Sequence, residues 1–446
     1  MLSRRELLKS GAAVAGAALI PSQVEAQAAA AQHPAISALQ SMTGQVRPIS
    51  VDERRKRLDR ARQLMAANKI DAIFMIGGSS MIYFTGVSWW NSERLGAFVL
   101  TAKGDPFFVA PAFEEGRMRE QLSGGPLDPN SERFRNRASM LREDVLKRTF
   151  WESEIRVWQE DQDPYWLVAQ ALRDRGISTG TLGMVERVTF VFSSGVAQAA
   201  PALKIVSATP VTAGCRMVKS QHELELMKIA NQATWNVYRA VHEAIQPGMT
   251  QRDVSALLAA GYAKVGFRGD ALIEVGEYTA LPHGSVAPQT IQDGTPILID
   301  GGCKVEGYES DITRTWVLGK ATDKQKQVFE IVQRAQKTAL AAAKPGVACE
   351  QVDAAARKVI TDAGFGPGYK YFTHRVGHGI GLDGHEWPYL VHGNSQPMAS
   401  GMTFSDEPGV YIRGEFGVRL EDDMHITAEG AELFTTPSPS IEQPFG

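Results

Sequence analysis

The chain of 446 residues is long enough for two or three domains, each with its own hydrophobic core. Its hydrophobic content of 43% and charged content of 22% are those of an ordinary globular protein. A formal net charge of -3 excludes the basic surface of a nucleic-acid-binding protein and a strongly acidic tail. The three cysteines, Cys215, Cys303 and Cys349, indicate neither a disulfide framework nor a CxxC site. Cys303 could be a soft metal ligand, but a small buried thiol is favoured.

Residues 1–28 have the features of a targeting segment. Twin arginines, Arg4-Arg5, precede the apolar run Gly11–Ile20, which is too short to span a bilayer, and Ala26-Gln27-Ala28 is a small-residue cleavage site. The segment resembles a twin-arginine (Tat) export signal, which implies export of a folded protein to the periplasm and no membrane anchor. A cytosolic amphipathic start is the alternative. Residues 29–50, rich in Ala and Gln and then mixed, are expected to form a flexible lead-in.

Residues 51–214 alternate helix-like and strand-like patterns, which predicts an α/β domain. The glycine-rich motifs of nucleotide-binding proteins do not occur in this part of the sequence. Adjacent Trp89 and Trp90 cannot both face one core from a strand, so one of them is expected at the surface, as a turn aromatic or as a contact for substrate or another subunit. Helices are expected over 51–67 and 165–175, and strands over 71–76, 97–101, 106–110, 181–185 and 204–208.

Residues 219–440 follow a boundary near 213–219 and combine four helices with three strand-rich segments. Ser220 and Glu223 form a capping box that opens the first helix, and Pro247-Gly248 stops it. Helices are expected over 220–245, 250–265, 323–344 and 349–364, and strands within 272–281, 296–318 and 402–427. This pattern predicts an α+β domain in which helices cover a curved, mostly antiparallel sheet.

The segment 295–316 carries the first of two carboxylate pairs. An apolar strand start, a turn signal at Glu306-Gly307 and an alternating second strand predict a β-hairpin. A hairpin symmetric about Val305 and Glu306 would place Asp300 directly opposite Asp311, with Cβ atoms about 5 Å apart. Two carboxylates so close repel unless a proton or a cation lies between them. The alternative is that one of the two faces solvent.

Three of the nine histidines, His374, His378 and His385, fall within the segment 373–386. Its many glycines argue against a helix, so the spacing of His374 and His378 is not that of a zinc-binding helix, whereas glycine lets backbone and ligand approach closely. A histidine near carboxylates can supply the nitrogen that orients a metal pair. For any one of these histidines alone, a structural role is the simpler interpretation.

The second carboxylate pair, Glu407 and Glu421, lies in the segment 404–426. A hairpin turning at Gly414 would again place the two carboxylates opposite each other. Alternation would then put four polar side chains on one face of the second strand: Arg419, Glu421, Asp423 and His425. Such a row is costly to bury unless it is paired or metal-bound, and a solvated sheet face is the alternative.

Together these segments offer four carboxylates and one imidazole, a donor set suited to two divalent ions about 3.5–4 Å apart with bridging carboxylates. Oxygen-rich ligation favours Mn²⁺, with Fe²⁺, Co²⁺ and Zn²⁺ as alternatives, over a sulfur-bound site. The candidate metal ligands are Asp300, Asp311, His378, Glu407 and Glu421.

The motifs IDGG…SDITRT, HRVGHGIGLDGHE, DEPGVY and VRLEDD resemble, in order and spacing, those of the pita-bread (M24) metallopeptidases of the aminopeptidase P and prolidase type. The stretch MIYFTG at 81–86 is similar to the creatinase-type N-terminal domain, so the resemblance covers roughly residues 50–435. It implies a pita-bread catalytic domain, two divalent ions with a bridging hydroxide, and hydrolysis of the Xaa-Pro bond in di- or oligopeptides. It also implies a homodimer or homotetramer.

The resemblance implies roles for individual residues as well. Glu407, besides binding metal, would pass a proton to the leaving nitrogen. His283, 17 residues before Asp300 in the motif ALPHG, resembles a substrate-binding histidine. With His385, it would hold the substrate carbonyl or stabilise the tetrahedral oxyanion.

Three further positions follow from the same resemblance. His374 would line the proline pocket, and Arg419 would hold the Glu421 face or reach a substrate carboxylate. The N-terminal domain, of this or a neighbouring subunit, would limit peptide length. Asp406 departs from the apolar or small residue usual there, so it adds a charge near the ligands and puts the specificity in question.

Two other functions occur on similar folds. A C–N hydrolase such as creatinase, or a lyase acting on a small non-peptide zwitterion, is the alternative. Creatinase-like enzymes lack the metal ligands, and the lyases alter the pattern around the first aspartate, whereas here the 11-residue spacing from Asp300 to Asp311 is standard. Histone-binding relatives lose ligands and carry no Tat signal. Methionine aminopeptidase is disfavoured because it lacks such an N-terminal domain.

Overall fold

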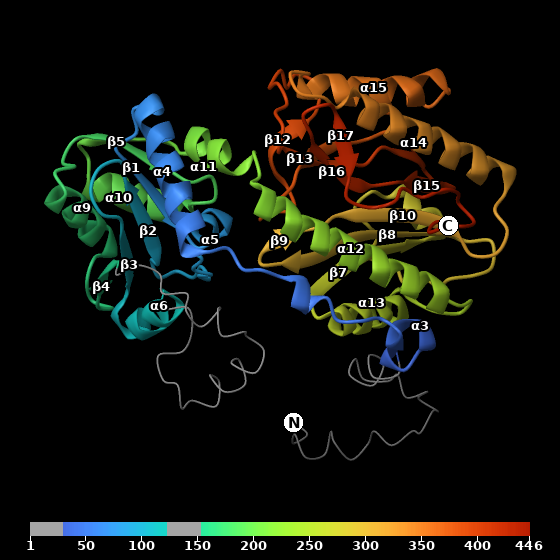
Figure 1. The fold of residues 1–446 in the computed structure, drawn as a ribbon, viewed down its shortest axis with the longest axis horizontal. Helices are drawn as coiled ribbons and strands as arrows, with labels where there is room; N and C mark the ends of the chain where they lie inside the picture. The colour runs from blue at the N-terminus through green and yellow to red at the C-terminus, as the bar shows by residue number, and fades with distance from the viewer. Residues whose placement is uncertain (1–29, 123–152) are drawn as a thin grey trace, which may run out of the picture.

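The computed structural model describes residues 30–122 and 153–446, so the predicted Tat signal lies outside the described residues. Two domains lie side by side, with the N-terminal domain on the left in Figure 1 and the C-terminal domain on the right. Helices α11 (Thr209–Arg216) and α12 (Gln221–Ala244) carry the chain from one domain to the other. Among the described helices, none is both long and apolar enough to cross a bilayer.

The N-terminal domain is built on one mixed sheet with the strand order β4-β3-β2-β1-β5-β6. The central strand β1 pairs antiparallel with β2 and parallel with β5, which confirms the predicted α/β class. Its strands are β1 (Ala72–Ile76), β2 (Ala97–Thr101), β3 (Phe107–Pro111), β4 (Glu154–Trp158), β5 (Gly180–Met184) and β6 (Leu203–Ser207). Its helices are α4 (Val51–Asn68), α5 (Ser79–Thr85), α6 (Glu115–Leu122), α9 (Pro164–Asp174), α10 (Phe190–Ala199) and α11.

Two local predictions in the first part of the chain have different outcomes. Trp89 is 6% exposed and Trp90 is 57% exposed, so one tryptophan does face the surface. Residues 30–50, in contrast, are wrongly predicted as a flexible lead-in. Ile36, in the short helix α3 (Pro34–Ser37), is fully buried, and the Met42 amide donates to the Val265 carbonyl at 2.9 Å. Burial of these apolar side chains against the C-terminal domain orders the segment, although its sequence has no regular hydrophobic pattern of its own.

The C-terminal domain places antiparallel sheets between two pairs of helices (Figure 1). Helices α12 and α13 (Gln251–Val265) cover the sheet β10-β8-β7, and α14 (Asp323–Ala342) and α15 (Cys349–Asp362) lie on the other side. The strands of the first sheet are β7 (Arg268–Val275), β8 (Pro296–Val305), β9 (Tyr308–Glu309) and β10 (Ile312–Val317). The remaining strands are β11 (Gly377–Gly379), β12 (Glu386–Leu390), β13 (Thr403–Asp406), β14 (Gly409–Ile412), β15 (Phe416–Arg419), β16 (Asp422–Ile426) and β17 (Ala431–Leu433).

The register of the first hairpin differs from the prediction. Asp300 pairs with Thr313, not with Asp311, because the chain turns at Glu306-Gly307 with Val305 opposite Tyr308. Glu306 takes the left-handed conformation at φ 52°, so it occupies the turn and cannot belong to the ladder. The shift amounts to two residues along one strand, and side chains alternate with a period of two. Asp311 therefore stays on the face that carries Asp300.

The second hairpin has the predicted register. Gly409 pairs with Arg419 on one side of an interruption and Asp406 pairs with Asp422 on the other, so Glu407 and Glu421 fall opposite each other between the two ladders. At this interruption Glu421 leaves its own sheet and forms an isolated bridge with Thr313 of β10. The bridge joins the two sheets and brings both carboxylate pairs to one place.

Candidate metal centre

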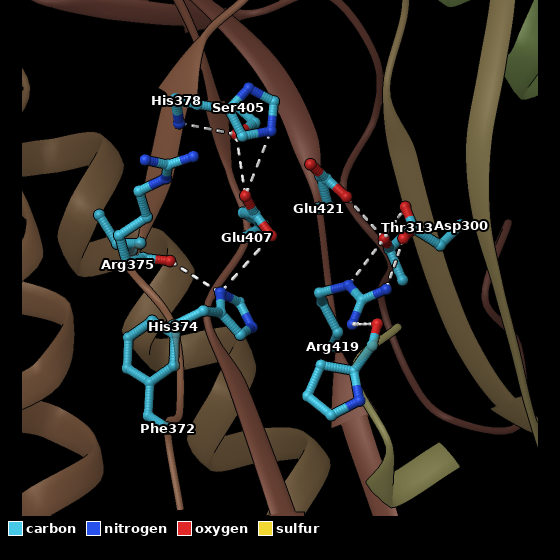
Figure 2. Close-up of polar contacts among 12 residues, drawn as sticks. Asp300, Thr313, Phe372, His374, Arg375, His378, Ser405, Glu407, Arg419 and Glu421 are labelled. Atoms are coloured by element: carbon cyan, nitrogen blue, oxygen red, sulfur yellow. Dashed lines mark hydrogen bonds and ion pairs between the residues drawn. The ribbon is translucent and has the colours of Figure 1, made fainter. Parts of the chain in front are cut away.

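Residues on or directly beside five strands, β8, β10, β11, β13 and β16, meet at the junction of the two sheets (Figure 2). Potential ligand atoms fall into three overlapping groups in which all atoms lie within 4.8 Å of one another. The groups are Asp300 with Asp311 and Glu421; His378 with Glu407 and Glu421; and Asp311 with His378 and His385. The structure thus brings together all five ligands expected from the sequence, and it adds His385 at the edge of the cluster.

His378 is held in one tautomer at this site. Its Nδ1 lies 3.2 Å from the Gly379 carbonyl, which can only accept, so Nδ1 carries the proton. The other ring nitrogen, Nε2, lies 3.3 Å from Glu407 Oε1 and 3.9 Å from Asp311 Oδ2. Burial lowers the pKa of His378 to about 3, so the ring is neutral. A neutral imidazole with its lone pair aimed at two carboxylates is a metal ligand in its binding form.

The carboxylates of the cluster resist ionisation together. Burial, followed by the charge of Asp300, raises the pKa of Asp311 well above its ordinary value. Burial and then Asp311 do the same to the pKa of Glu421, and burial raises the pKa of Glu407 to about 8. Carboxyl groups so close cannot all ionise without a compensating positive charge. Either protons or cations must therefore accompany them.

A single threonine hydroxyl lies between two of these carboxylates. Thr313 Oγ1 is 2.7 Å from Asp300 Oδ1 and 2.6 Å from Glu421 Oε2 (Figure 2). The hydroxyl has one proton to donate, so the second short contact requires a proton on a carboxyl group. Glu421 is the member of this pair with the raised pKa, and we assign that proton to it.

Arg419 bonds directly to Asp300 and reaches Glu421 through Thr313, because its Nε donates to Thr313 Oγ1 at 3.2 Å. Its Nη2 lies 2.5 Å from Asp300 Oδ2, and Nη1 donates to Tyr411 Oη at 2.9 Å and to the Pro282 carbonyl at 3.2 Å. Burial opposes ionisation of Asp300, but the guanidinium of Arg419 outweighs it, so the pKa of Asp300 lies below its ordinary value. Arg419 is 2% exposed and lines the cleft, so its contact with a substrate carboxylate stays a prediction.

His374 takes part in a chain of hydrogen bonds that starts at Arg419. Tyr411 Oη accepts from Arg419 and lies 2.7 Å from His374 Nε2, and His374 Nδ1 lies 2.8 Å from the Arg375 carbonyl. The carbonyl fixes the proton on Nδ1, so Nε2 accepts from the tyrosine hydroxyl. Burial lowers the pKa of His374 to about 3. Both nitrogens are thus engaged, and His374 presents a neutral ring to the site.

A cleft of about 330 Å³ opens over the cluster. His283 and His385, which the sequence predicts to hold the substrate, are exposed in its lining. The His385 ring stacks on that of His378 with centroids 3.7 Å apart. Arg375 Nη2 lies 3.3 Å from His385 Nδ1, and because a guanidinium only donates, Nδ1 accepts and the ring proton lies on Nε2. His385 can therefore donate a hydrogen bond from Nε2 to an oxygen in the cleft.

Asp406 does not add a charge to the site. Alternation along the strand directs it away from the face of Glu407, and it is not among the residues that line the cleft. It is fully buried, and neither carboxyl oxygen has a hydrogen-bond partner among the described residues. Burial, with the charges of Asp422 and Glu407, raises the pKa of Asp406 well above its ordinary value, so the group stays protonated. Burial thus argues against a charge of Asp406 beside the ligands, and its effect on specificity stays a prediction.

The row of polar residues on the second hairpin is buried, so the alternative of a solvated sheet face is wrong for Arg419, Glu421 and Asp423. Asp423 Oδ2 accepts from the Asp311 amide and from Asn231 Nδ2, both at 2.9 Å. It therefore holds the backbone of a ligand rather than binding in the cluster. Thr313 and Tyr411 also support the ligands, and they have no signal in the sequence beyond their place beside the motifs.

A network of ions from the N-terminal side fastens the loop that carries His385. Arg216, at the end of α11, donates to Asp383 Oδ2 at 2.7 Å and forms a very short contact with Glu386. Lys219 Nζ donates to Glu386 Oε1 at 2.6 Å, and Ser79 Oγ donates to Asp383 Oδ1 at 2.6 Å. The position of His385 thus depends on residues outside the catalytic sheet.

The sequence matches two families. Metallopeptidase family M24 matches residues 225–428, and the Creatinase/Prolidase N-terminal domain matches residues 57–218. A protein named Probable dipeptidase PepE from Mycobacterium tuberculosis (strain H37Rv) is 33% identical over 384 residues, which cover 84% of this chain and 92% of the relative. The Xaa-Pro dipeptidase of Lactobacillus delbrueckii subsp. lactis is 29% identical, over 86% of this chain and 98% of the relative.

Solved structures of similar proteins have the same fold. Dipeptidase PepE from Mycobacterium ulcerans superposes with a TM-score of 0.77 at 32% identity, over 89% of this chain and 99% of that chain. The Xaa-Pro dipeptidase from Bacillus anthracis gives a TM-score of 0.72 at 27% identity, over 87% of this chain and 99% of that chain. These likenesses confirm the predicted pita-bread domain with a creatinase-type N-terminal domain.

Proposed function

Because this chain belongs to metallopeptidase family M24, we propose that it is a metal-dependent hydrolase of the peptide bond that precedes proline. The observation that carries the proposal is the cluster of four carboxylates and one neutral imidazole at the floor of a cleft. Relatives similar over most of their length include proteins named Xaa-Pro dipeptidase. A C–N hydrolase or lyase lacks a comparable observation in its favour.

The residues present fit two divalent cations. Ligand atoms from three groups lie within 4.8 Å, and the carboxylates at Asp311 and Glu421 hold protons that a cation would replace. The neutral His378 directs Nε2 at the same point. Asp300, Asp311, His378, Glu407 and Glu421 would hold the ions. When bound, such ions supply a hydroxide nucleophile near neutral pH by lowering the pKa of water.

The other groups of the cleft would act on the peptide itself. His385 donates from Nε2 to the carbonyl oxygen of the scissile bond, which places a positive dipole where negative charge develops. His283 lines the same cleft and can support that oxygen. Glu407, which lines the cleft beside the other candidate ligands, would take a proton from the attacking water and deliver it to the leaving nitrogen. His374 offers a neutral ring face to the proline.

The test is a direct assay. The purified protein, treated with chelator and then reloaded with Mn²⁺, Co²⁺, Fe²⁺ or Zn²⁺, is incubated with Ala-Pro, Gly-Pro, Ala-Pro-Ala and the matched peptide Ala-Ala. We expect release of the residue before proline only after metal is restored. Absence of release with every metal, by a protein shown to bind two ions per chain, would refute the proposal.

Three finer features belong to the same proposal. Mn²⁺ is the favoured ion because four of the five donors are carboxylates; metal analysis of protein purified without added metal tests this. Export to the periplasm is supported by Arg4-Arg5 and the apolar run after them, and fractionation of cells that produce the double variant Arg4→Lys/Arg5→Lys tests it. Assembly into a homodimer or homotetramer is expected from the family and is tested by light scattering.

A further inference from the structure

A second cavity, of about 270 Å³, lies between the two domains beside the catalytic cleft. The N-terminal domain lines it with the start of α5, the segment after β5 and helix α11, and the C-terminal domain lines it with the start of β12 (Figure 1). His385 lines both spaces, so a molecule in the cavity would lie next to this imidazole. The volume is close to that of the smallest ligand pockets, about 300 Å³, so it suits one small molecule rather than a peptide.

The inner wall of this interdomain cavity carries charges that already balance one another. Asp383 accepts from Arg216 and Ser79, and Glu386 contacts Arg216 and Lys219. Burial opposes ionisation of both carboxyl groups, but the two cations outweigh it and hold the pKa of Asp383 and of Glu386 below its ordinary value. One donor remains, because the buried Nε of Arg216 has no hydrogen-bond partner among the described residues. The inner wall is therefore neutral and keeps one N–H group for a ligand oxygen.

The rim of the cavity, in contrast, carries an acid next to a base that are both exposed. Glu186 accepts one hydrogen bond, from Thr212 Oγ1 at 2.6 Å, and its other oxygen has no partner among the described residues. The side chain of Arg187 is 72% exposed, and its contact with Asp383 at 3.4 Å is longer than the 2.7 Å contact of Arg216 with the same carboxylate. The rim therefore offers one negative and one positive group to a ligand that carries both charges.

An aromatic wall faces the same space. Trp387 is 37% exposed and lines the cavity together with Val185 and Ile76. The ring of Tyr389 supports the indole edge-on, with centroids 5.6 Å apart. An indole face packs against aliphatic groups and attracts a nearby ammonium group through its π electrons. The wall is thus suited to a small ligand with an aliphatic part and a positive charge.

We propose that the interdomain cavity is a second ligand site, which binds a free α-amino acid with its carboxylate on Arg187, its ammonium group on Glu186 and its side chain on Trp387. An α-amino acid carries both charges on one carbon atom, which matches an acid and a base on adjacent residues. A planar guanidinium pairs with both oxygens of a carboxylate. Hydrolysis of a dipeptide in the neighbouring cleft would release such a ligand; this source of the ligand rests on the proposed function, whereas the site itself does not.

The experiment follows binding of L-proline by fluorine NMR of metal-free protein labelled with 5-fluorotryptophan. The variant Trp387→Phe identifies the signal of Trp387 among those of the eight tryptophans. We expect L-proline to shift this signal in a saturable way. L-Prolinamide, which lacks the carboxylate, and N-acetyl-L-proline, which lacks the ammonium group, should each bind about tenfold more weakly or less, as for the loss of one hydrogen-bonded charge.

Two variants locate the ligand. Arg187→Gln should remove the preference for L-proline over L-prolinamide, and Glu186→Gln should remove the preference over N-acetyl-L-proline. Both side chains are exposed, so neither replacement should disturb folding. The matched control is Arg173→Gln, because Arg173 is an exposed arginine of the same domain that does not line the cavity, and it should leave both preferences unchanged.

Three outcomes would overturn the assignment: no saturable shift of the Trp387 signal, equal binding of L-proline and its two analogues by wild-type protein, or preferences that persist in both variants. The last would place the ligand in the catalytic cleft, with Trp387 responding through His385. The failure of the proposed function is a separate result, because the NMR experiment involves no turnover. If no peptide is cleaved, a preference for L-proline that disappears in Arg187→Gln still supports the second site.

Discussion

Replacement of Arg314 by methionine should destabilise the C-terminal domain more than any surface substitution. Arg314 and Asp422 are both fully buried, and Nη2 lies 2.7 Å from Oδ1. Removal of the cation leaves a buried carboxylate without its partner, which costs about 3–5 kcal/mol. Asp422 keeps hydrogen bonds from Thr435 at 2.6 Å and Gln336 at 3.1 Å, which places the expected loss at the lower end, about 3 kcal/mol.

The same substitution should weaken metal binding. Arg314 Nη1 donates to the Glu421 carbonyl at 2.8 Å, so it fixes the backbone of a candidate ligand from behind the sheet. We expect a 10- to 100-fold weaker metal affinity, roughly the range for loss of a group that supports a ligand. Glu421 itself keeps its bridge to Thr313, so some binding should remain.

The assay is hydrogen exchange along a urea series, read by mass spectrometry on peptides from 296–317, with metal affinity measured by competition with a chromogenic chelator. The double variant Arg314→Met/Asp422→Asn is the matched control, because asparagine removes the unpaired charge and its Oδ1 keeps the hydrogen bond from Thr435, although its amide nitrogen cannot accept from Gln336. It should recover about half of the lost stability. A loss below about 1 kcal/mol in the single variant, or no recovery in the double variant, would refute the argument.

Three further results are expected. Asp311→Asn should reduce bound metal from about two ions per chain to one or fewer, measured by mass spectrometry of the metals, while Asp270→Asn on the exposed part of β7 should not; unchanged metal would remove Asp311 from the ligand set. Glu407 and Asp423 have pKa values raised by burial to about 8, so the native metal-free protein keeps protons that the unfolded chain releases. Its Tm should therefore fall as pH rises from about 4 to 8 and level off above, and added metal should restore most of the loss at pH 8; a Tm that rises through this window contradicts the assignment. Tyr411→Phe should lower kcat/KM about tenfold, because the hydroxyl joins the buried arginine to the neutral histidine, and an unchanged kcat/KM would show that this link has no function.

The positions of most candidate metal ligands can be predicted because turn residues and the alternation of side chains along a strand are visible in the local sequence. Glu407 and Glu421 are placed by one turn at Gly414, and the ladders on both sides keep that register. The predicted register of the first hairpin is two residues off because Glu306 takes a left-handed conformation that only its neighbour Gly307 would suggest. The face of Asp311 is nevertheless correct because side chains alternate with a period of two.

Other features depend on contacts between distant segments and have no local signal. Tyr411 joins Arg419 to His374 across separate strands, and neither its spacing nor its type marks it in the sequence. The composition of residues 30–50 predicts flexibility, yet Ile36 and Met42 are buried, and the helix that carries Ile36 packs against α12 and α13 of the C-terminal domain. The sequence predicts a charge at Asp406, whereas burial decides its protonation.

The ion network at Arg216 has a consequence for how such enzymes can be rebuilt. Arg216 and Ser79 belong to the N-terminal half, yet they hold Asp383, two residues before His385, the imidazole proposed to stabilise the oxyanion. A chimaera that combines the N-terminal half of one relative with the C-terminal half of another would contain every metal ligand. It would still misplace that imidazole unless its N-terminal half also supplied the partners of Asp383. Full activity therefore requires an N-terminal and a C-terminal half whose contacts match. Chimaeras joined near residue 218 should lose kcat while they still bind metal.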